Sequence, residues 1–274
     1  MRLNRYAGES FGSGLTISRR FMNPFKPKIL RYESLPSTNN EAARLATLGA
    51  EEGLTVVADE QTAGRGRLQR TWVSPKGAGL YFSILLLPKI PQDRWPLITF
   101  MASLSVSDAL LQSCDLETDI KWPNDLLASE RKICGILAEV IETDRGRGIV
   151  LGIGINLTSE AFPAELASAA ISVAEATGRR PEREKVLAAL IAALSNWYAL
   201  LNENGGDEKI VAAWKSQSSY AEGKLVTVVN ADESITGITR GLETDGALRL
   251  ETESGELVTL RAGDVVSVRA TGNR

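Results

Sequence analysis

Arginine and glycine residues alternate in one segment of the chain, and this alternation is typical of a loop that binds an anion. The segment reads Gln61-Thr62-Ala63-Gly64-Arg65-Gly66-Arg67-Leu68-Gln69-Arg70-Thr71-Trp72. Guanidinium groups pair with carboxylate or phosphate oxygens through two parallel hydrogen bonds, and glycine lets backbone N–H groups approach an anion closely. A solvated basic loop is the alternative, although the glycines and Trp72 are unusual in a segment that serves solubility alone.

Two further segments carry polar side chains beside apolar strands. In Lys121-Trp122-Pro123-Asn124-Asp125 the proline restricts the turn and presents Asn124 and Asp125 together, although the same pattern can simply end a strand. Lys132 precedes the mostly apolar run 133–137, where its ammonium group either aims at an anion or lies outward above apolar surface. Neither segment identifies a chemistry on its own.

The segment Gly152-Ile153-Gly154-Ile155-Asn156 contains a glycine pair that invites comparison with nucleotide-binding loops. The third glycine of the dinucleotide fingerprint is missing and no obvious helix follows, and the chain contains no Gly-x-x-x-x-Gly-Lys-Ser/Thr motif. The alternative is a strand with two small residues against which another group packs closely. The segment alone supports the two interpretations about equally.

The sequence contains no histidine, which limits the chemistry that the chain can perform. Ser-His-Asp and Cys-His catalytic arrangements are excluded, as is every metal site that needs imidazole. The two cysteines, Cys114 and Cys134, form no CxxC pair and no disulfide framework. We expect two buried thiols in a reducing, cytoplasmic compartment.

The composition is that of a folded soluble protein with one large domain and a small appendage. The chain has 274 residues, 43% of them hydrophobic and 24% charged, and its formal net charge is −3. That charge argues against a protein that binds nucleic acid over its whole surface. Uninterrupted apolar stretches such as residues 84–88 are far shorter than the roughly 20 residues of a membrane span, so we expect no such span.

The hydrophobic pattern of the first part of the chain predicts strands that position these polar segments. Strands are expected at residues 29–35, 55–59, 80–87, 118–122, 133–141 and 148–157. A hairpin turn at 144–147 joins the last two of them. Residues 60–79 are expected to form a long loop, and loops of that length inside compact domains are usually functional.

Helices and a second group of strands complete the prediction. A helix is expected to begin at Ser37 or Thr38, because Thr38 and Glu41 have capping-box spacing, and further helices are expected at 94–111 and within 164–218. Short β-rich runs then follow at residues 225–229, 234–240, 247–251, 256–261 and 265–269. Short strands at such regular spacing indicate a small all-β unit, which we interpret as a barrel.

In their order and spacing, the polar segments together resemble the biotin–protein ligase family. The matching segments are Ser37-Thr38-Asn39, the loop 64–72, Lys121–Asp125, Lys132-x-x-Gly135-Ile136-Leu137 and Gly152–Asn156. The resemblance covers residues 29 to about 269 and implies an α+β fold. A mixed sheet with flanking helices, as in class II synthetases, would form a catalytic domain over residues 29–220, and an SH3-like β-barrel would form residues 221–274.

The activity implied by the resemblance is a two-step, ATP-dependent ligation. The carboxylate of biotin attacks the α-phosphate of ATP, with Mg²⁺ carried by the triphosphate, and leaves biotinyl-5′-AMP and pyrophosphate. A lysine of a biotin carboxyl carrier protein then attacks this mixed anhydride. The first step brings two anions together and needs fixed cations, whereas a carboxylate is already ionised and needs no histidine as a base.

The resemblance also implies roles for individual residues. The residues implied to bind biotin are Ser37, Thr38, Asn39, Gln61, Arg65, Gly66, Arg67 and Lys132. Those implied to bind ATP are Arg70, Trp72, Lys132 and Asn156. The implied catalytic residues are Lys132, Arg65, Arg67 and Asp125, of which Asp125 accepts the proton of the incoming lysine. No metal site formed by protein groups alone is implied.

Three features differ from other members of the family or lie outside the resemblance. Repressor members carry a winged helix-turn-helix ahead of the catalytic domain, but only about 28 residues precede the first strand here, so we expect no sequence-specific DNA binding. Leu68-Gln69 stand where some relatives have a glycine pair, which alters loop flexibility. Residues 1–28 contain six basic side chains and one acidic one, and we expect a mobile, non-catalytic tail.

Other functions and assemblies are left open at this point. Lipoate or octanoate transfer could use Cys134 as a nucleophile, although a thiol inside an apolar strand has a raised pKa and is inert. A protein that senses biotin could keep the adenylate without transferring it. A monomer and a homodimer are both compatible with the sequence, and the carboxylase that supplies the carrier is not identified.

Overall fold

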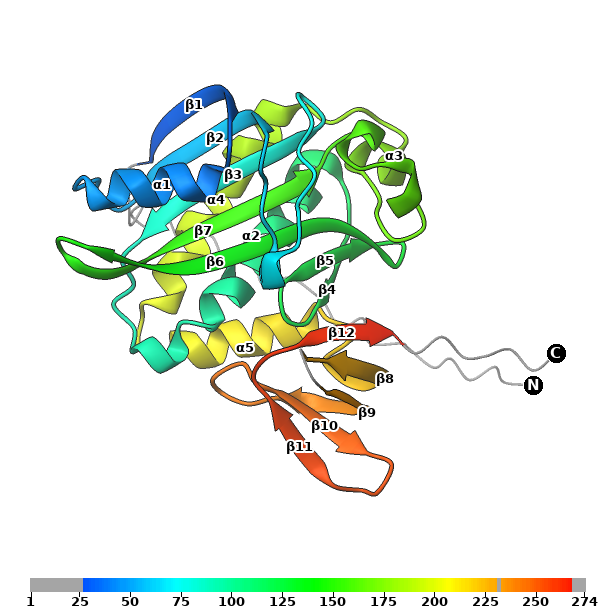
Figure 1. Ribbon diagram of the computed structural model, residues 1–274. Helices are drawn as coiled ribbons and strands as arrows, with labels where there is room; N and C mark the ends of the chain where they lie inside the picture. Colours follow the sequence, from blue (N-terminus) through cyan, green and yellow to red (C-terminus); the bar gives the residue numbers. More distant parts are fainter. Residues whose placement is uncertain (1–26, 231–232, 268–274) are drawn as a thin grey trace, which may run out of the picture.

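The computed structural model describes residues 27–230 and 233–267, which form two β-sheets with helices packed around them (Figure 1). Of the predicted tail, only Pro27 and Lys28 lie within the described residues, and the first strand begins at Lys28. The second sheet begins at Glu222, close to the predicted domain boundary.

The first sheet contains seven strands and carries most of the polar segments. Its strands are β1 (Lys28–Leu35), β2 (Leu54–Gln61), β3 (Gly79–Leu86), β4 (Asp119–Lys121), β5 (Asp125–Ala128), β6 (Arg131–Thr143) and β7 (Gly146–Asn156). Their order is β1-β2-β3-β7-β6-β5-β4, with β1 and β2 parallel and all other neighbours antiparallel. Because β6 and β7 pair along a long hairpin, the start of β6 lies beside the end of β7.

Helices cover both faces of this sheet (Figure 1). They are α1 (Thr38–Thr47), α2 (Leu97–Cys114), α3 (Val173–Thr177), α4 (Arg183–Leu201) and α5 (Gly206–Ser216). Alternate residues of β2 point to opposite faces: Val56 and Ala58 pack with Ala42 of α1, whereas Val57 joins the main core with α2 and α4. The strand is buried on both sides, which explains why its first part is continuously apolar or β-branched.

The helices α2 and α4 are apolar on nearly every side because they pack against each other and against the sheet. By length and hydropathy alone both are long and apolar enough to cross a membrane, although polar residues interrupt their apolar stretches. In the structure, 61% and 50% of their most apolar windows are buried inside the protein. Burial in the core accounts for this composition.

The second sheet is antiparallel and packs against the first domain. Its strands are β8 (Glu222–Val229), β9 (Ser234–Leu242), β10 (Leu248–Thr252), β11 (Leu257–Leu260) and β12 (Asp264–Ser267), in the order β11-β10-β9-β8-β12. Val226 and Leu248 belong to the same core cluster as α2, and Trp122 Nε1 donates a hydrogen bond to the Gly246 carbonyl at 3.1 Å. Asp264, the first residue of β12, thereby lies beside Arg67 and Arg70 in the segment between β2 and β3.

The structure differs from the sequence-based prediction in several details. The helix expected at 94–111 begins at Leu97, because a short 3₁₀ turn and Pro96 precede it. The short strand β5 was not predicted, and helical residues between 164 and 218 divide into α3, α4 and α5 with 3₁₀ turns before them. Ser37 caps α1, so the Thr38–Glu41 capping box does not form. Cys114 is half-buried rather than buried.

Candidate active site

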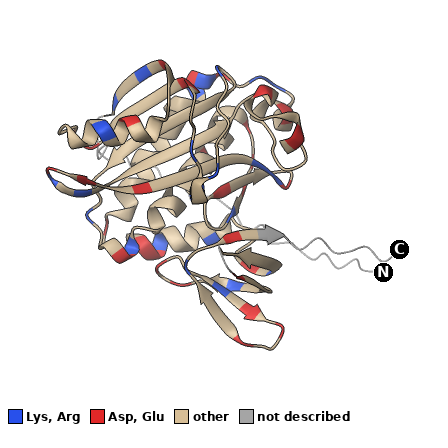
Figure 2. Cartoon of the chain, in the orientation of Figure 1, with Lys and Arg blue, Asp and Glu red and all other residues tan. Residues whose placement is uncertain are grey.

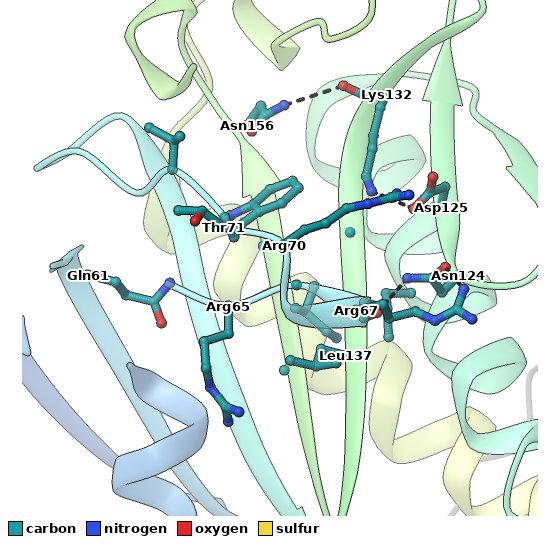
Figure 3. A pocket seen from close by; sticks show the side chains of 18 of the residues that line it. Gln61, Arg65, Arg67, Arg70, Thr71, Asn124, Asp125, Lys132, Leu137 and Asn156 are labelled. Atoms are coloured by element: carbon teal, nitrogen blue, oxygen red, sulfur yellow. Dashed lines mark hydrogen bonds and ion pairs between the residues drawn. The ribbon is translucent and has the colours of Figure 1, made fainter. Parts of the chain in front are cut away.

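A cavity of about 270 Å³ lies over β6 and β7, and the loop between β2 and β3 forms one of its walls. The predicted site residues all line it: Ser37, Thr38, Asn39, Gln61, Arg65, Gly66, Arg67, Arg70, Trp72, Asp125, Lys132 and Asn156. They come from the cap and start of α1, the end of β2, the loop, β5, β6 and β7, and Figure 3 shows several of them around the space. Sequence segments that are more than a hundred residues apart thus meet at one place.

The amino end of α1 and the end of β2 form a buried, hydrogen-bonded wall of the cavity. Ser37 Oγ accepts a hydrogen bond from the Asn40 N–H, and this cap begins the helix. The backbone N–H and the hydroxyl of Thr38 both donate to Gln61 Oε1, at 2.8 and 3.0 Å. Gln61 Nε2 in turn donates to Ser74 Oγ at 2.8 Å, which fixes the orientation of the Gln61 amide. These uncharged groups suit a polar, neutral part of a ligand.

The glycine pair on β7 makes room for side chains from elsewhere. A Cβ at Gly152 would collide with the amide of Asn39, and a Cβ at Gly154 would collide with the indole ring of Trp72. The close-packing interpretation of this segment is therefore correct. Lys132 Nζ stands over the Trp72 ring, 5.5 Å from its centroid, and Trp72 Nε1 has no hydrogen-bond partner among the described residues.

The loop between β2 and β3 is folded back on itself by its own backbone. The Trp72 N–H donates to the Gly64 carbonyl at 2.9 Å, and the Gly66 N–H donates to the Arg70 carbonyl at 2.7 Å. At the tip, Leu68 and Gln69 adopt left-handed backbone angles, with φ of 52° and 59°. A glycine pair would adopt these angles without steric cost, so the loop keeps a glycine-like shape despite Leu68-Gln69.

Each arginine of the loop is paired with a carboxylate. Arg65 Nη2 lies 2.6 Å from Glu139 Oε2, and Arg67 Nη1 and Arg70 Nη1 lie 3.2 and 2.6 Å from the two oxygens of Asp264. Figure 3 shows Arg65 pointing away from Lys132 and Asp125, whereas Arg70 extends toward them. The structure thus brings Arg70, Lys132 and Asp125 together and leaves Arg65 at the other end of the cavity.

Lys132 and Asp125 form an ion pair where β5 and β6 begin. Lys132 Nζ lies 2.6 Å from Asp125 Oδ1, and Lys121 Nζ lies 3.9 Å from Asp125 Oδ2. Lys121 is opposite Asp125 in the β4–β5 ladder. Burial lowers the pKa of Lys121, an effect that the neighbouring Asp125 partly offsets. Asp125 therefore stands between two ammonium groups, of which only Lys132 makes a close contact.

Two asparagine side chains are held by the backbone around this ion pair. Asn124 Nδ2 donates to the Ile136 carbonyl at 2.8 Å, and its Oδ1 accepts from Arg67 at 3.0 Å. Asn156 Nδ2 donates to the carbonyls of Lys132 and Ile171, at 3.3 and 3.2 Å (Figure 3). Both Asn156 N–H groups are thus used within the protein, and its Oδ1 is the group left for a ligand.

Three residues of the site were not predicted from the sequence. Asn124 was noted only as part of a turn, and Glu139 and Asp264 were not considered. Acidic residues on a strand and after a turn are common on protein surfaces, so their types and positions gave no signal. Only the pairing of β6 with β7 and the packing of β12 on the first domain bring them to the arginines.

The thiol of Cys134 lies below the cavity in the core. Cys134 is fully buried on β6, and burial raises the pKa of its thiol far above the usual range. A thiol in this state is protonated and cannot act as a nucleophile at neutral pH. The structure thereby removes the main support for transfer through a covalent cysteine intermediate.

Comparison with known proteins places this arrangement in a family. A model described as the biotin/lipoate A/B protein ligase family matches residues 32–156, and a model of the biotin protein ligase C-terminal domain matches residues 223–267. The chain is 35% identical over 230 residues to the bifunctional ligase/repressor BirA of Bacillus subtilis, covering 83% of this chain and 70% of that protein. The chain belongs to the biotin protein ligase family.

Further relatives agree with this membership. The biotin–[acetyl-CoA-carboxylase] ligase of Mycobacterium tuberculosis is 30% identical over 238 residues, which cover 85% of this chain and 86% of that protein. The biotin protein ligase of Aquifex aeolicus, solved in complex with biotin and ATP, superposes with a TM-score of 0.76 at 31% identity, covering 88% of this chain and 98% of that chain. All the predicted site residues fall inside the family match at 32–156, and Asp264 falls inside the match of the C-terminal domain.

Proposed function

We propose that this protein activates biotin as biotinyl-5′-AMP with ATP and transfers the biotinyl group to a lysine of a biotin carboxyl carrier protein. The observation that carries the proposal is the cavity itself: uncharged hydrogen-bonding residues line one end, and Arg67, Arg70 and Lys132 line the other. Such a site can hold a neutral head group and two anionic groups at once. Membership in the biotin protein ligase family supports the same activity.

For the first step, we assign the cationic end of the cavity to the reacting carboxylate and phosphate. Two unit charges of like sign 4 Å apart repel by about 4 kcal/mol at an effective dielectric constant of about 20, and fixed cations offset that repulsion as the atoms approach. Lys132 would contact the oxygens between which the bond forms, and Arg67 and Arg70 would contact the phosphates. The cavity's carboxylates, Asp125 and Asp264, are paired with these cations, so we propose that Mg²⁺ is held by the triphosphate oxygens.

The two ends of the cavity suit the two substrates in different ways. Ser37, Thr38, Asn39 and Gln61 would hydrogen-bond the ureido group of biotin, because they are neutral and fixed by their neighbours. Trp72 would stack against adenine, and its unpaired indole N–H is a donor for the ligand. Asn156 would accept a hydrogen bond from the adenine amino group, since its own N–H groups are already used.

For the second step, we propose that Asp125 accepts the proton of the incoming lysine. An amine is protonated at neutral pH and must lose a proton before it attacks the mixed anhydride. Asp125 Oδ1 pairs with Lys132 Nζ at 2.6 Å. When Lys132 moves to the adenylate, this oxygen becomes available, so that the same lysine would bind the intermediate and release the base.

The remaining parts of the proposal concern the fold of the C-terminal sheet, the cellular location and DNA binding. We propose that the five strands β8–β12 belong to an SH3-like barrel, which their short length and antiparallel order support. We also propose a cytoplasmic protein without operator-DNA binding. In Figure 2 basic and acidic residues lie side by side on the described helices and hairpin tips, a mixture that does not favour a nucleic-acid surface.

The experiment that tests the proposed function is exchange of labelled pyrophosphate into ATP. Exchange should depend on biotin, and it should not be supported by lipoate or octanoate at equal concentration. Labelled biotin should then pass to an isolated biotin carboxyl carrier domain. Exchange with lipoate or octanoate but not with biotin would overturn the proposal, and exchange without transfer would show a protein that senses biotin instead.

A further inference from the structure

Glu139 lies behind the cavity and connects two parts of its wall. The residue is on β6, its side chain is 30% exposed, and its Oε2 accepts hydrogen bonds from both Asn39 Nδ2 at 2.8 Å and Arg65 Nη2 at 2.6 Å. Asn39 and Arg65 line the cavity, whereas Glu139 does not. One carboxylate oxygen is therefore shared between α1 and the arginine loop without touching the ligand space.

The amide of Asn39 is held in one of its two orientations. Its Oδ1 accepts a hydrogen bond from Ser83 Oγ at 2.6 Å, which leaves its second lone pair for another donor, and its Nδ2 donates to Glu139 and, at 3.4 Å, to the Leu137 carbonyl. If the amide turned over, its oxygen would face the carboxylate and the carbonyl, and acceptors would then oppose acceptors. Asn39 is 5% exposed and packs against Gly152, so its amide cannot turn outward to hydrogen-bond with solvent instead.

We propose that Glu139 is a positioning residue for head-group recognition: it fixes the amide of Asn39 so that Oδ1 is presented to the ligand as a hydrogen-bond acceptor. The proposal rests on the proposed function, because the ligand group concerned is the ureido ring of biotin. That ring carries two N–H donors, and an acceptor fixed in advance binds them without reorganising. Without the carboxylate, the amide can present N–H groups to these donors instead.

The same carboxylate also holds Arg65 at the head-group end of the cavity. Arg65 pairs with Glu139 and points away from Lys132 (Figure 3). Because Glu139 Oε2 also accepts from Asn39 Nδ2, the carboxylate has a second partner besides Arg65.

The first test is Glu139→Gln, with Glu142→Gln as the matched control. Glu142 is on the same strand, and its exposed carboxylate pairs with Arg147 at 2.7 Å. Isothermal titration should show biotin binding weakened roughly tenfold to a hundredfold in Glu139→Gln, which is the range for a lost charged hydrogen bond, while ATP binding changes by less than about twofold. Glu142→Gln should leave both affinities unchanged. Normal biotin affinity in Glu139→Gln, or an equal loss of ATP and biotin affinity, would overturn the inference.

The second test asks whether Glu139 acts through Asn39. Asn39→Asp places two carboxylates against each other and should weaken biotin binding strongly. Adding Glu139→Gln to that variant should restore part of the affinity, because the amide introduced at position 139 can donate to the carboxylate introduced at position 39. Independent, additive losses would contradict the inference. If the unaltered protein does not bind biotin, the proposed function fails; if it binds biotin and the double variant shows no recovery, only the role of Glu139 fails.

Discussion

Lys132 lines the cationic end of the cavity. It pairs with Asp125 and lies over the Trp72 ring. No other ammonium group among the described residues has this set of contacts: Lys121, at the end of β4, lies 3.9 Å from Asp125 and does not line the cavity. At the scale of single residues, we therefore expect the proposed chemistry to depend most on this side chain.

We predict that Lys132→Ala reduces biotin-dependent pyrophosphate exchange by about a hundredfold or more, the range for losing one charged transition-state contact. Its side chain is about one-third exposed, so the fold should be retained, as circular dichroism can check. Lys185→Ala is the control, because Lys185 is an exposed lysine that also pairs with a carboxylate. Near-normal exchange in Lys132→Ala would show that this lysine has no part in the first step.

The two thiols should differ sharply in reactivity, because only Cys114 is partly exposed. Burial raises the pKa of Cys134, so its thiolate forms only at pH values well above neutrality and the native protein should be modified first at Cys114. Titration with a thiol reagent, before and after unfolding, measures this difference. We also predict that Cys134→Ala keeps transfer activity within about threefold. A complete loss in a folded Cys134→Ala variant would revive a covalent mechanism.

At the scale of elements, the loop between β2 and β3 owes its shape to Gly64 as much as to its arginines. A Cβ at Gly64 would collide with the Trp72 carbonyl, which accepts from Ser74 Oγ and lies next to the N–H that closes the loop. Leu68, in contrast, has a left-handed backbone and a side chain that is 58% exposed. A change at one position should thus open the loop, and a change at the other should be tolerated.

We predict that Gly64→Ala increases tryptic cleavage at the loop arginines, because the closing hydrogen bonds can no longer form together. Leu68→Gly should be close to neutral, since glycine relieves a left-handed angle that costs about 1 kcal/mol but adds a similar entropy loss on folding. Limited proteolysis of the two variants beside the unaltered protein gives the comparison. Equal cleavage in all three would mean that the loop is not held by these contacts.

The sequence predicted the long strands well and missed one short strand. Long strands with strong patterns, such as β3, β6 and β7, were located within about two residues, as was the hairpin between β6 and β7. The strand β5 was missed because it is four residues long and follows a proline turn. Of the two predicted caps of α1, the structure has Ser37; the Thr38 hydroxyl is instead bonded to Gln61, a partner that lies far away in the sequence.

The sequence predicted the cationic and neutral polar residues of the site, but it did not predict the carboxylates that pair with the loop arginines. The cations and neutral polar groups stand in recognisable segments, and the structure places all of them around one cavity. Their carboxylate partners could not be found, because Glu139 and Asp264 reach the arginines only through sheet pairing and packing of the second sheet. Types and spacing along the chain carry no signal for such contacts.

At the scale of the whole molecule, the two sheets share one continuous core. Phe100 and Trp214 stack with ring centroids 4.8 Å apart, and Gly246 at the turn before β10 lies against Phe100 while accepting from Trp122. Residues of α2, α5, β8 and β10 belong to the same apolar cluster. The second sheet is therefore not an independently mobile attachment.

We predict that thermal or urea unfolding of the described domains occurs in a single cooperative transition, because separating the sheets would expose this shared core. Coincident curves from tryptophan fluorescence and far-ultraviolet circular dichroism would establish it. Trp214→Ala should lower the stability of both sheets together by roughly 3–5 kcal/mol, the usual range for removing a buried tryptophan. Two separate transitions would show that the sheets unfold as independent units.

The pairing of every arginine in the loop has a consequence for how fast substrates arrive. The four positive charges of Arg65, Arg67, Arg70 and Lys132 are paired with the three negative charges of Glu139, Asp264 and Asp125, so only one positive charge is left over to act on the surroundings. Long-range attraction of an anionic substrate depends on net charge, whereas short-range binding depends on individual contacts. The association rate of ATP should accordingly change little with ionic strength. Selectivity would then arise after encounter, when phosphate and carboxylate groups exchange partners within the cavity.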